Sequence, residues 1–338
     1  MGFPPNLLSL PLEILSMITN LLAAPDLLNL ITCSRSSKAI FMGHLWKNHF
    51  HLAFIWAAKN EYDDTAAYAM KFRPPNLHAY TEHYAGYEGL IFERPFLSEA
   101  AAYGLPKTTS LLLDQGLDVN YIQPKLKQTA LLNSLRLDRH KYRIEPKGAK
   151  YFEVTKLLLE KGANPELRDE KGNTALALAV KMDSEPWVKL LLKYNADVNS
   201  RNDSDETPLA LALQFNNYSV IELLISQGAD VTAQISFYNS KLPMIAIGKL
   251  SARTTSLLIE HGASPYGGYE LYRSSLFHAY YSRNLEVLRL ILECEPPETE
   301  DYSRKAKSDL IEKCRHEIRF ARDDKNLMQE MIALLEGD

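Results

Sequence analysis

The chain has 338 residues, of which 46% are hydrophobic and 24% charged, and its formal net charge at pH 7 is -4. This apolar fraction excludes a disordered chain, because it is large enough to supply a packed core. A charge so close to zero supplies no long-range field for nucleic acid or a membrane surface, so partners must be chosen by local contacts. No apolar run approaches the length of a membrane span. Three scattered cysteines predict neither a disulfide framework nor a zinc site and favour a reducing compartment, cytoplasmic or nuclear.

Residues 7–50 contain three segments in which apolar residues recur at helical spacing. Pro11 suits the first position of a helix, and Glu13 suits its first turn, where the helix dipole favours an acid. Pro25 and Asp26 repeat this start signal before a strongly apolar second segment. Three short helices bury too small a core to be stable alone, so we expect part of their apolar surface to contact a partner or the neighbouring module.

Residues 5–50 resemble the F-box in their Leu-Pro start, the Asp-Leu of the second helix and the Leu-Trp close. The resemblance implies a helical module that binds the Skp adaptor, and through it a cullin, in a Skp/cullin/F-box ubiquitin ligase. Apolar anchors of this kind are typical of a helix-in-groove interface. The expected adaptor contacts are Leu10, Pro11, Ile14, Leu15, Ile18, Leu27, Leu30, Leu45 and Trp46. The alternative is that the bundle only caps the N-terminal end of the repeats that follow.

Residues 52–91 predict a degenerate first repeat followed by a tyrosine-rich connection. Small and apolar residues at 55–58 and 66–70 fit a pair of helices, whereas Pro74 and Pro75 end the second one. Five tyrosines lie between Tyr62 and Tyr87. They either form a surface for a partner or pack a long loop onto its scaffold, and the sequence does not separate these two interpretations.

The same local pattern is written twice at an interval of 33 residues between Lys171 and Ser236. Each copy has a Thr-x-Leu helix start, a second apolar run and an Ala-Asp-Val segment, which predicts a helix, a turn, a helix and an extended finger. Asn195 and Gly228 fall where the second helix must end in a left-handed residue. This pattern resembles the ankyrin repeat. The frame extends over residues 92–301, and residues 302–338 are predicted to form a degenerate C-terminal capping repeat.

The predicted fold is all-α, with an N-terminal three-helix F-box bundle followed by an ankyrin-repeat solenoid with short β-hairpin fingers. One repeat departs from the frame, because Gly162 lies 46 residues after Gly116 where 33 are expected. The excess is predicted to lie between the two helices of that repeat, near residues 139–150. Residues 125–150 contain eight Lys or Arg against two acids. This basic segment either selects an acidic or phosphorylated partner or is a solvated loop.

No phosphate-binding loop, paired-cysteine spacing, His-Glu-x-x-His motif or nucleophile elbow occurs in the chain, so we expect no enzyme, no cofactor and no metal. The predicted function is that of a substrate-recognition subunit of a Skp/cullin/F-box ubiquitin ligase, with an ankyrin-repeat interaction scaffold as the alternative. Substrate contacts are expected on the concave side, on the fingers and the exposed face of each first helix. These residues are Tyr121, Arg168, Lys181, Arg201, Asn202, Tyr266, Tyr269, Tyr280 and Tyr281.

Overall fold

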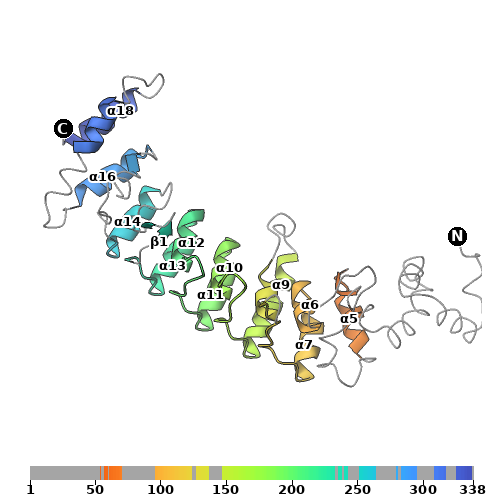
Figure 1. Cartoon of the computed structure of the whole chain (residues 1–338). Coiled ribbons are helices and arrows are strands. Elements are labelled where there is room, and N and C mark those ends of the chain that lie inside the picture. The colour runs from red at the N-terminus through yellow and green to blue at the C-terminus, as the bar shows by residue number, and fades with distance from the viewer. Residues whose placement is uncertain are drawn as a thin grey trace, which may run out of the picture. The chain divides into compact units, whose positions relative to one another are not determined.

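The computed structural model is described for residues 54, 57–59, 61–70, 96–123, 127–136, 147–232, 235–237, 240–242, 251–263, 279–280, 283–294, 308–316 and 325–336. The chain divides into two compact units, Met1–Asn164 (unit 1) and Pro165–Asp338 (unit 2), and each is described by itself. The predicted F-box, residues 5–50, lies outside the described residues and stays a prediction. Figure 1 shows both units as helices connected by loops.

Unit 1 is built from helices that pack pairwise. Its described helices are α5 (Asp63–Ala69), α6 (Phe96–Ala102), α7 (Pro106–Asp114), α8 (Ala130–Ser134) and α9 (Lys147–Glu160). Helix α6 packs against α7 and α8 packs against α9, while α6 also contacts α8 and α7 also contacts α9. Each helix therefore buries one side against its partner and another against the next pair, which is how short helices acquire a core.

Unit 2 repeats this arrangement. Its described elements are α10 (Ala175–Lys181), α11 (Glu185–Lys193), α12 (Pro208–Phe215), α13 (Tyr218–Ser226), β1 (Ile235–Phe237), β2 (Ser240–Leu242), α14 (Ala252–Glu260), α16 (Leu285–Glu293) and α18 (Lys325–Glu336). Residues 308–316 are also helical. Helix α10 packs on α11 and α12, α13 packs on α11, α12 and α14, and α16 packs on α14 and α18. Among the helices of the described ranges, none is both long enough and apolar enough to cross a bilayer.

The first helix of each complete pair in the middle of the chain begins at a capping threonine. The hydroxyl oxygen of Thr129 accepts a hydrogen bond from Leu132 N at 3.2 Å, and Thr207 accepts one from Ala210 N at 3.2 Å. Thr174 does the same in α10. Such a cap contributes about 1 kcal/mol by satisfying a backbone donor that has no partner within the helix. The predicted Thr-x-Leu starts are therefore confirmed in these three helices.

Left-handed residues end the second helices, as the sequence predicts. Asn195 has φ 59° and Gly228 has φ 85°. Asp205, which occupies in its repeat the place of Gly172, has φ 61° against φ 70° for the glycine. A left-handed conformation costs glycine nothing, and Asn and Asp tolerate it better than other residues do. The 33-residue frame thus predicts backbone conformation at single positions.

The described fingers are mostly turns. One short β-hairpin is present, in which β1 pairs antiparallel with β2 and Ile235 lies opposite Leu242. Residues 166–173 and 199–206, which form two other fingers, contain no strand. The prediction of β-hairpin fingers therefore does not hold for these two, because short-range main-chain hydrogen bonds and not a strand ladder close the turns.

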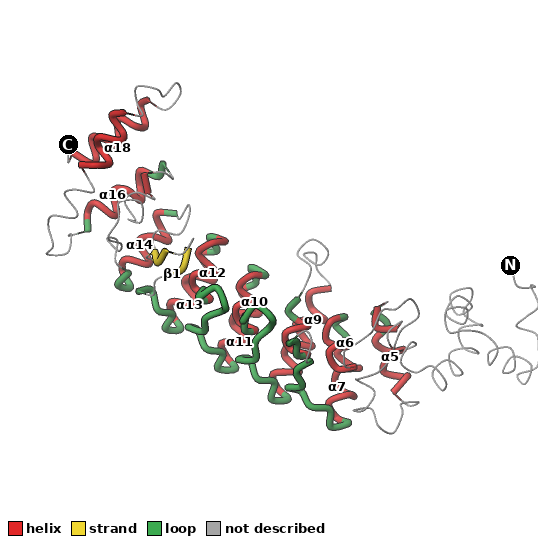
Figure 2. The backbone as a smooth tube through the Cα atoms, viewed as in Figure 1, coloured by secondary structure: helices red, strands yellow, loops and turns green. Residues whose placement is uncertain are grey.

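The repeat with the long spacing contains the longest second helix of the described pairs. Helix α9 has 14 residues, whereas α7, α11 and α13 have 9 each. All four helices end two residues before the corresponding glycine or asparagine, so the additional five residues lie at the N-terminus of α9. Part of the predicted insert, residues 147–150, is therefore helix. Residues 137–146 lie outside the described part of the chain (Figure 2).

Candidate protein-binding surface

Three fingers can be compared at their described residues, which exclude residues 124–126 of the first. We call residues 120–128 of unit 1 finger A, and residues 166–173 and 199–206 of unit 2 fingers B and C. In each, a main-chain hydrogen bond closes the turn, from Gln123 N to Gln128 O at 2.9 Å in finger A, for example. The corresponding distances are 3.0 Å in finger B, from Asp169 to Asn173, and 3.1 Å in finger C, from Asn202 to Glu206.

The base of each finger is tied to the next repeat by one polar side chain. Asn120 Nδ2 donates to Gly162 O at 3.2 Å, and Asn120 Oδ1 accepts from Asn164 N at 2.7 Å. Asn199 makes the same pair of bonds in unit 2, to Gly228 O at 3.1 Å and from Asp230 N at 2.8 Å. These links fix the position of each finger relative to the helix pair that follows it in the same unit.

Fingers B and C share a polar network with the first helices α10 and α12. Asn173 Oδ1 accepts hydrogen bonds from Lys181 Nζ at 2.7 Å and from Asn202 Nδ2 at 3.3 Å. The Glu206 carboxylate accepts from Asn202 Nδ2 at 2.9 Å and from Gln214 Nε2 at 2.8 Å. Two predicted contact residues, Lys181 and Asn202, are therefore brought together, and both are held in place by bonds within the protein.

The two predicted arginine contacts of unit 2 are also bonded internally. Arg168 donates from its guanidinium to Arg201 O. Arg201 Nη1 in turn donates to the Asp205 carboxylate at 2.8 Å and to Asp205 O at 3.2 Å. Asp203 N donates to Lys171 O at 3.1 Å and so joins the two finger tips. These side chains stabilise the fingers, which is a structural role that the sequence prediction did not assign to them.

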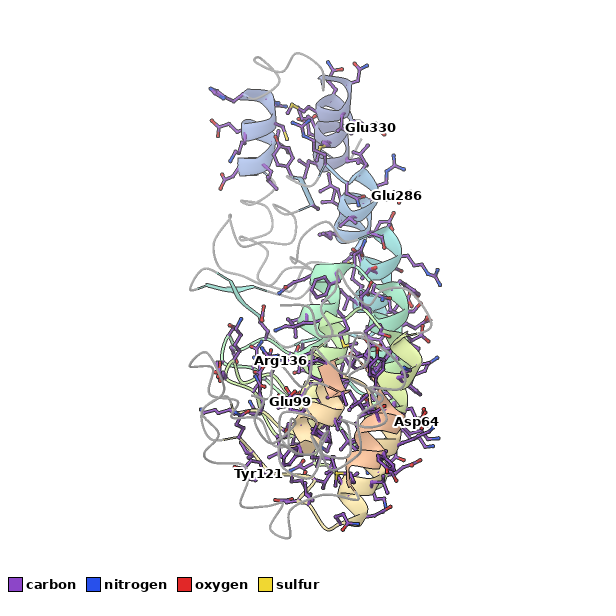
Figure 3. All side chains as sticks on the ribbon, turned by 90° about the vertical axis from the view of Figure 1, so that its right-hand side faces the viewer. Asp64, Glu99, Tyr121, Arg136, Glu286 and Glu330 are labelled. Carbon is purple, nitrogen blue, oxygen red and sulfur yellow. The ribbon has the colours of Figure 1, made fainter. Side chains whose placement is uncertain are left out.

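Finger A of unit 1 differs in what it exposes. Tyr121 is half-buried, Ile122 is 45% exposed, and Lys127 and Arg136 are exposed. The side chains of Tyr121, Lys127 and Arg136 make no hydrogen bond or ion pair with any other described residue. Figure 3 labels Tyr121 of the finger and Arg136, which follows α8. Of the predicted substrate contacts, Tyr121 is thus the one whose hydroxyl is not engaged within the described part of the protein.

Tyr280 is a correction to the sequence prediction, because its side chain is only 3% exposed. It lies three residues before the left-handed Arg283, as the buried Val180 and Leu213 lie before Asp183 and Asn216. Tyr280 therefore belongs to the core and is not available as a surface contact. The other three tyrosines predicted in this region, Tyr266, Tyr269 and Tyr281, lie outside the described residues, as do all nine predicted adaptor contacts.

The sequence analysis missed three residues of the polar network, Asn173, Glu206 and Gln214. A usable signal was present, since Asn173 and Glu206 are 33 residues apart, as are Lys181 and Gln214. Polar residues that recur at the same position of successive repeats lie next to one another along the stack.

Two titratable groups show shifts with clear physical causes. The hydrogen bond from Lys107 to Asp64, at 2.7 Å, raises the pKa of Lys107, and the negative charge of Asp64 acts in the same direction. Burial raises the pKa of the Cys294 thiol, and Glu293 adds to that effect. A raised thiol pKa lowers the fraction of reactive thiolate. No group of three or more metal-ligating side chains gathers in the described residues.

Stacked pairs of short helices that are linked by fingers define a helical repeat protein. Comparison with known proteins specifies the class: residues 147–235 match the family model "Ankyrin repeats (3 copies)". This region therefore consists of ankyrin repeats. Repeats of this class generally bind other proteins.

Two individual proteins extend this comparison. A putative ankyrin repeat protein of Acanthamoeba polyphaga mimivirus is 36% identical over 81 residues, which are 24% of this chain and 42% of that protein. The chain thus spans less than half the length of this relative. The crystal structure of an ankyrin repeat domain from Acinetobacter baumannii AYE is similar with a TM-score of 0.50 and 21% identity, over 58% of this chain and 95% of that one. This likeness concerns the fold alone.

Proposed function

We propose that this chain is a non-catalytic receptor whose ankyrin repeats bind a partner protein and whose N-terminal segment recruits the Skp adaptor of a ubiquitin ligase. The observation that supports partner binding is the ankyrin array of residues 147–235, in which the repeats share a side formed by fingers and first helices. Such fingers supply contact residues on a rigid scaffold. In ubiquitin transfer the receptor's contribution is proximity, because it holds a substrate near the ligase's catalytic centre.

The recruitment part of the proposal is supported by the sequence of residues 10–46 and not by the described structure. Pro11, Ile14 and Leu15 are the apolar residues expected to enter a groove of the adaptor. A Skp and cullin partnership also assigns the protein to the cytosol or nucleus. The alternative function is an interaction scaffold whose N-terminal helices recruit no ligase.

The test is co-elution of the full-length chain with purified Skp adaptor in size-exclusion chromatography. We expect the unaltered chain to co-elute and the triple variant Pro11→Ala, Ile14→Ala, Leu15→Ala to lose the complex, because hot-spot residues of an interface carry most of its binding energy. A matched control replaces three exposed lysines of α9 and α11, Lys156, Lys189 and Lys193, by alanine and should leave the complex intact.

Failure of the unaltered chain to bind the adaptor would remove the ligase role and leave the scaffold function. Binding that survives the triple substitution would show that a different surface holds the adaptor. Circular dichroism of each variant establishes that the repeats remain folded, so loss of the complex reports on the interface and not on unfolding.

A further inference from the structure

One position of the finger holds an apolar residue in unit 1 and a basic residue in unit 2. Ile122 of finger A, Arg168 of finger B and Arg201 of finger C each lie six residues after the residue that ends the preceding helix pair. Both arginines are bonded within the fingers of unit 2. The isoleucine is 45% exposed. An apolar side chain that stands exposed on a rigid turn is well placed to be a binding anchor.

A second position, at or just beyond the C-terminal end of the first helix of each repeat, shows the same contrast. Arg136, Lys181 and Gln214 each lie seven residues after the capping threonine of their repeat. Lys181 and Gln214 donate to side chains of their own finger, at 2.7 and 2.8 Å. Arg136 is exposed and has no such partner among the described residues. A guanidinium left available in this way suits bidentate recognition of a carboxylate.

Two buried amides next to finger A also have unused hydrogen-bonding capacity. Gln128 is 3% exposed and Asn133 is 4% exposed. Neither Gln128 Oε1 nor Asn133 Nδ2 has a hydrogen-bond partner in the described part of the chain. The residues that correspond to Gln128 in unit 2, Asn173 and Glu206, are bonded. One free atom is an acceptor and the other is a donor, which are the two kinds of hydrogen-bonding group that a main chain also carries.

The charges of the three fingers differ in sign. Finger A, Asn-Tyr-Ile-Gln-Pro-Lys-Leu-Lys-Gln, contains two lysines and no acid. Fingers B and C contain three acids each, against two basic residues in B and one in C. Residues 125–150, which begin within finger A, carry eight Lys or Arg against two acids. Finger A therefore attracts negative charge, whereas fingers B and C repel it.

From these observations we infer that the surface formed by Tyr121, Ile122, Lys127 and Arg136, which we call the finger A surface, binds an extended acidic segment of the partner protein. An apolar residue of that segment contacts Ile122 and Tyr121, and its carboxylates face Arg136 and Lys127. The inference rests on the proposed function, because it assigns the partner's chemistry to one of the repeats' fingers. Fingers B and C then hold the scaffold rigid and contribute less to binding this acidic segment than finger A does.

The experiment selects peptides from a phage-displayed random library on the immobilised full-length chain and measures the enriched peptides by fluorescence anisotropy. Enriched sequences are expected to combine Asp or Glu with an apolar residue, and their affinity should fall as salt is raised. Ile122→Arg, which installs the residue type of the other two fingers, and Arg136→Gln, which installs that of Gln214, should each weaken binding about fivefold or more.

Two matched controls lie in the same unit. Leu111 is 38% exposed on α7, so Leu111→Arg makes the same exchange at similar exposure away from the finger. Lys156→Gln removes an exposed positive charge from α9. Both controls should change the affinity less than about twofold. Equal thermal melting of all four variants separates a lost contact from a lost fold.

Enrichment of basic peptides, no enrichment, or equal weakening by Leu111→Arg and Ile122→Arg would each overturn the inference. Displacement of the peptides by a single-stranded oligonucleotide of equal negative charge would also overturn the inference, because the surface would then be a general polyanion site. Basic peptides that bind through unit 2 would refute the finger A surface while leaving the proposed receptor function in place. Adaptor co-elution is measured separately, so the two proposals can fail independently.

Discussion

Finger A of unit 1 and fingers B and C of unit 2 are each closed by a main-chain hydrogen bond, but they differ in what their described side chains do. In unit 2 the polar side chains bond to one another, as Lys181 and Asn202 do through Asn173. In unit 1 the corresponding Arg136 is exposed and not bonded to a described residue, and Ile122 is 45% exposed. A polar residue on a finger therefore indicates binding only when its hydrogen bonds are not already used within the protein, which sequence position alone does not reveal.

The largest expected effect comes from Gly172 at the tip of finger B. It has φ +70°, and a Cβ placed there would lie 2.3 Å from Asp203 Oδ1 and 2.7 Å from Asp203 N. Gly172→Ala should lower the free energy of unfolding by about 3 kcal/mol, because strain and overpacking add. Urea unfolding of the full chain, with hydrogen exchange to locate the loss in unit 2, measures it.

Gly228→Ala is the matched control, since Gly228 has φ +85° and no atom within 4 Å of the added Cβ. Its cost should be about 1 kcal/mol, which is the cost of the left-handed backbone alone. Equal losses in the two variants would mean that the contact between fingers B and C at Asp203 does not constrain the structure.

The links between successive repeats come next in size. Asn120→Ala and Asn199→Ala each remove two hydrogen bonds to main-chain atoms and should each cost about 1 to 2 kcal/mol. The loss should be localised to unit 1 for the first variant and to unit 2 for the second. Hydrogen exchange resolved by residue measures both, and a loss in only one unit would show that the fingers are not held alike.

A smaller effect is expected at Asp63, which caps α7 from a different helix. Its carboxylate accepts hydrogen bonds from Lys107 N and Thr108 N, both at 2.9 Å. Helix α7 has no side-chain cap of its own at Leu105. Asp63→Ala should therefore cost about 1 kcal/mol by removing the acceptor of these two helix N-terminal donors.

The neighbouring Asp64 provides the control for that variant. It pairs with Lys107 through side chains that are 85% and 65% exposed, so Asp64→Asn should not measurably change the unfolding midpoint at neutral pH. The pair raises the pKa of Lys107 above 10.5, so its contribution is complete below that pH and is lost only as pH rises through the raised value. A midpoint that shifts near neutral pH in Asp64→Asn would contradict this assignment.

The smallest predicted difference tests the opening comparison directly. Lys181→Ala removes a bond to the buried Asn173 and should cost up to about 1 kcal/mol, since Asn202 still donates to that oxygen. Arg136→Ala, at the equivalent position of unit 1, should leave stability unchanged. Differential scanning calorimetry of the two variants measures the difference, and a loss at Arg136 as large as at Lys181 would show that Arg136 is also structural.

Much of the fold followed from the sequence because the repeat interval fixes equivalent positions. The frame predicted left-handed conformations at Asn195 and Gly228 and helix starts at the threonines of the two copies, Thr174 and Thr207, and each is confirmed. It also places Tyr280 with the core residues of other repeats, so the prediction of a surface contact at Tyr280 is wrong. The position of Tyr280 around its helix is the better guide to its burial, because this position decides which side of a helix is buried.

The candidate site was less predictable than the fold. Whether Arg168 and Arg201 are available to a partner depends on hydrogen bonds between fingers, and these depend on distances that a single sequence does not supply. The unbonded state of Arg136 has the same origin. Its position corresponds to Lys181, but Gln128 Oε1, in the place of Asn173 Oδ1, accepts no hydrogen bond. The residue at the partner position, and not Arg136 itself, therefore decides whether this hydrogen bond forms.

Asn120 and Asn199 join successive repeats through carbonyl and amide groups of the backbone, at Gly162 and Asn164 in one case and at Gly228 and Asp230 in the other. Every residue type except proline offers both groups. Sequence changes at the finger tips can therefore accumulate without disturbing the register of the stack. The scaffold is open to laboratory retargeting, in which tip segments are exchanged while the two asparagines are kept.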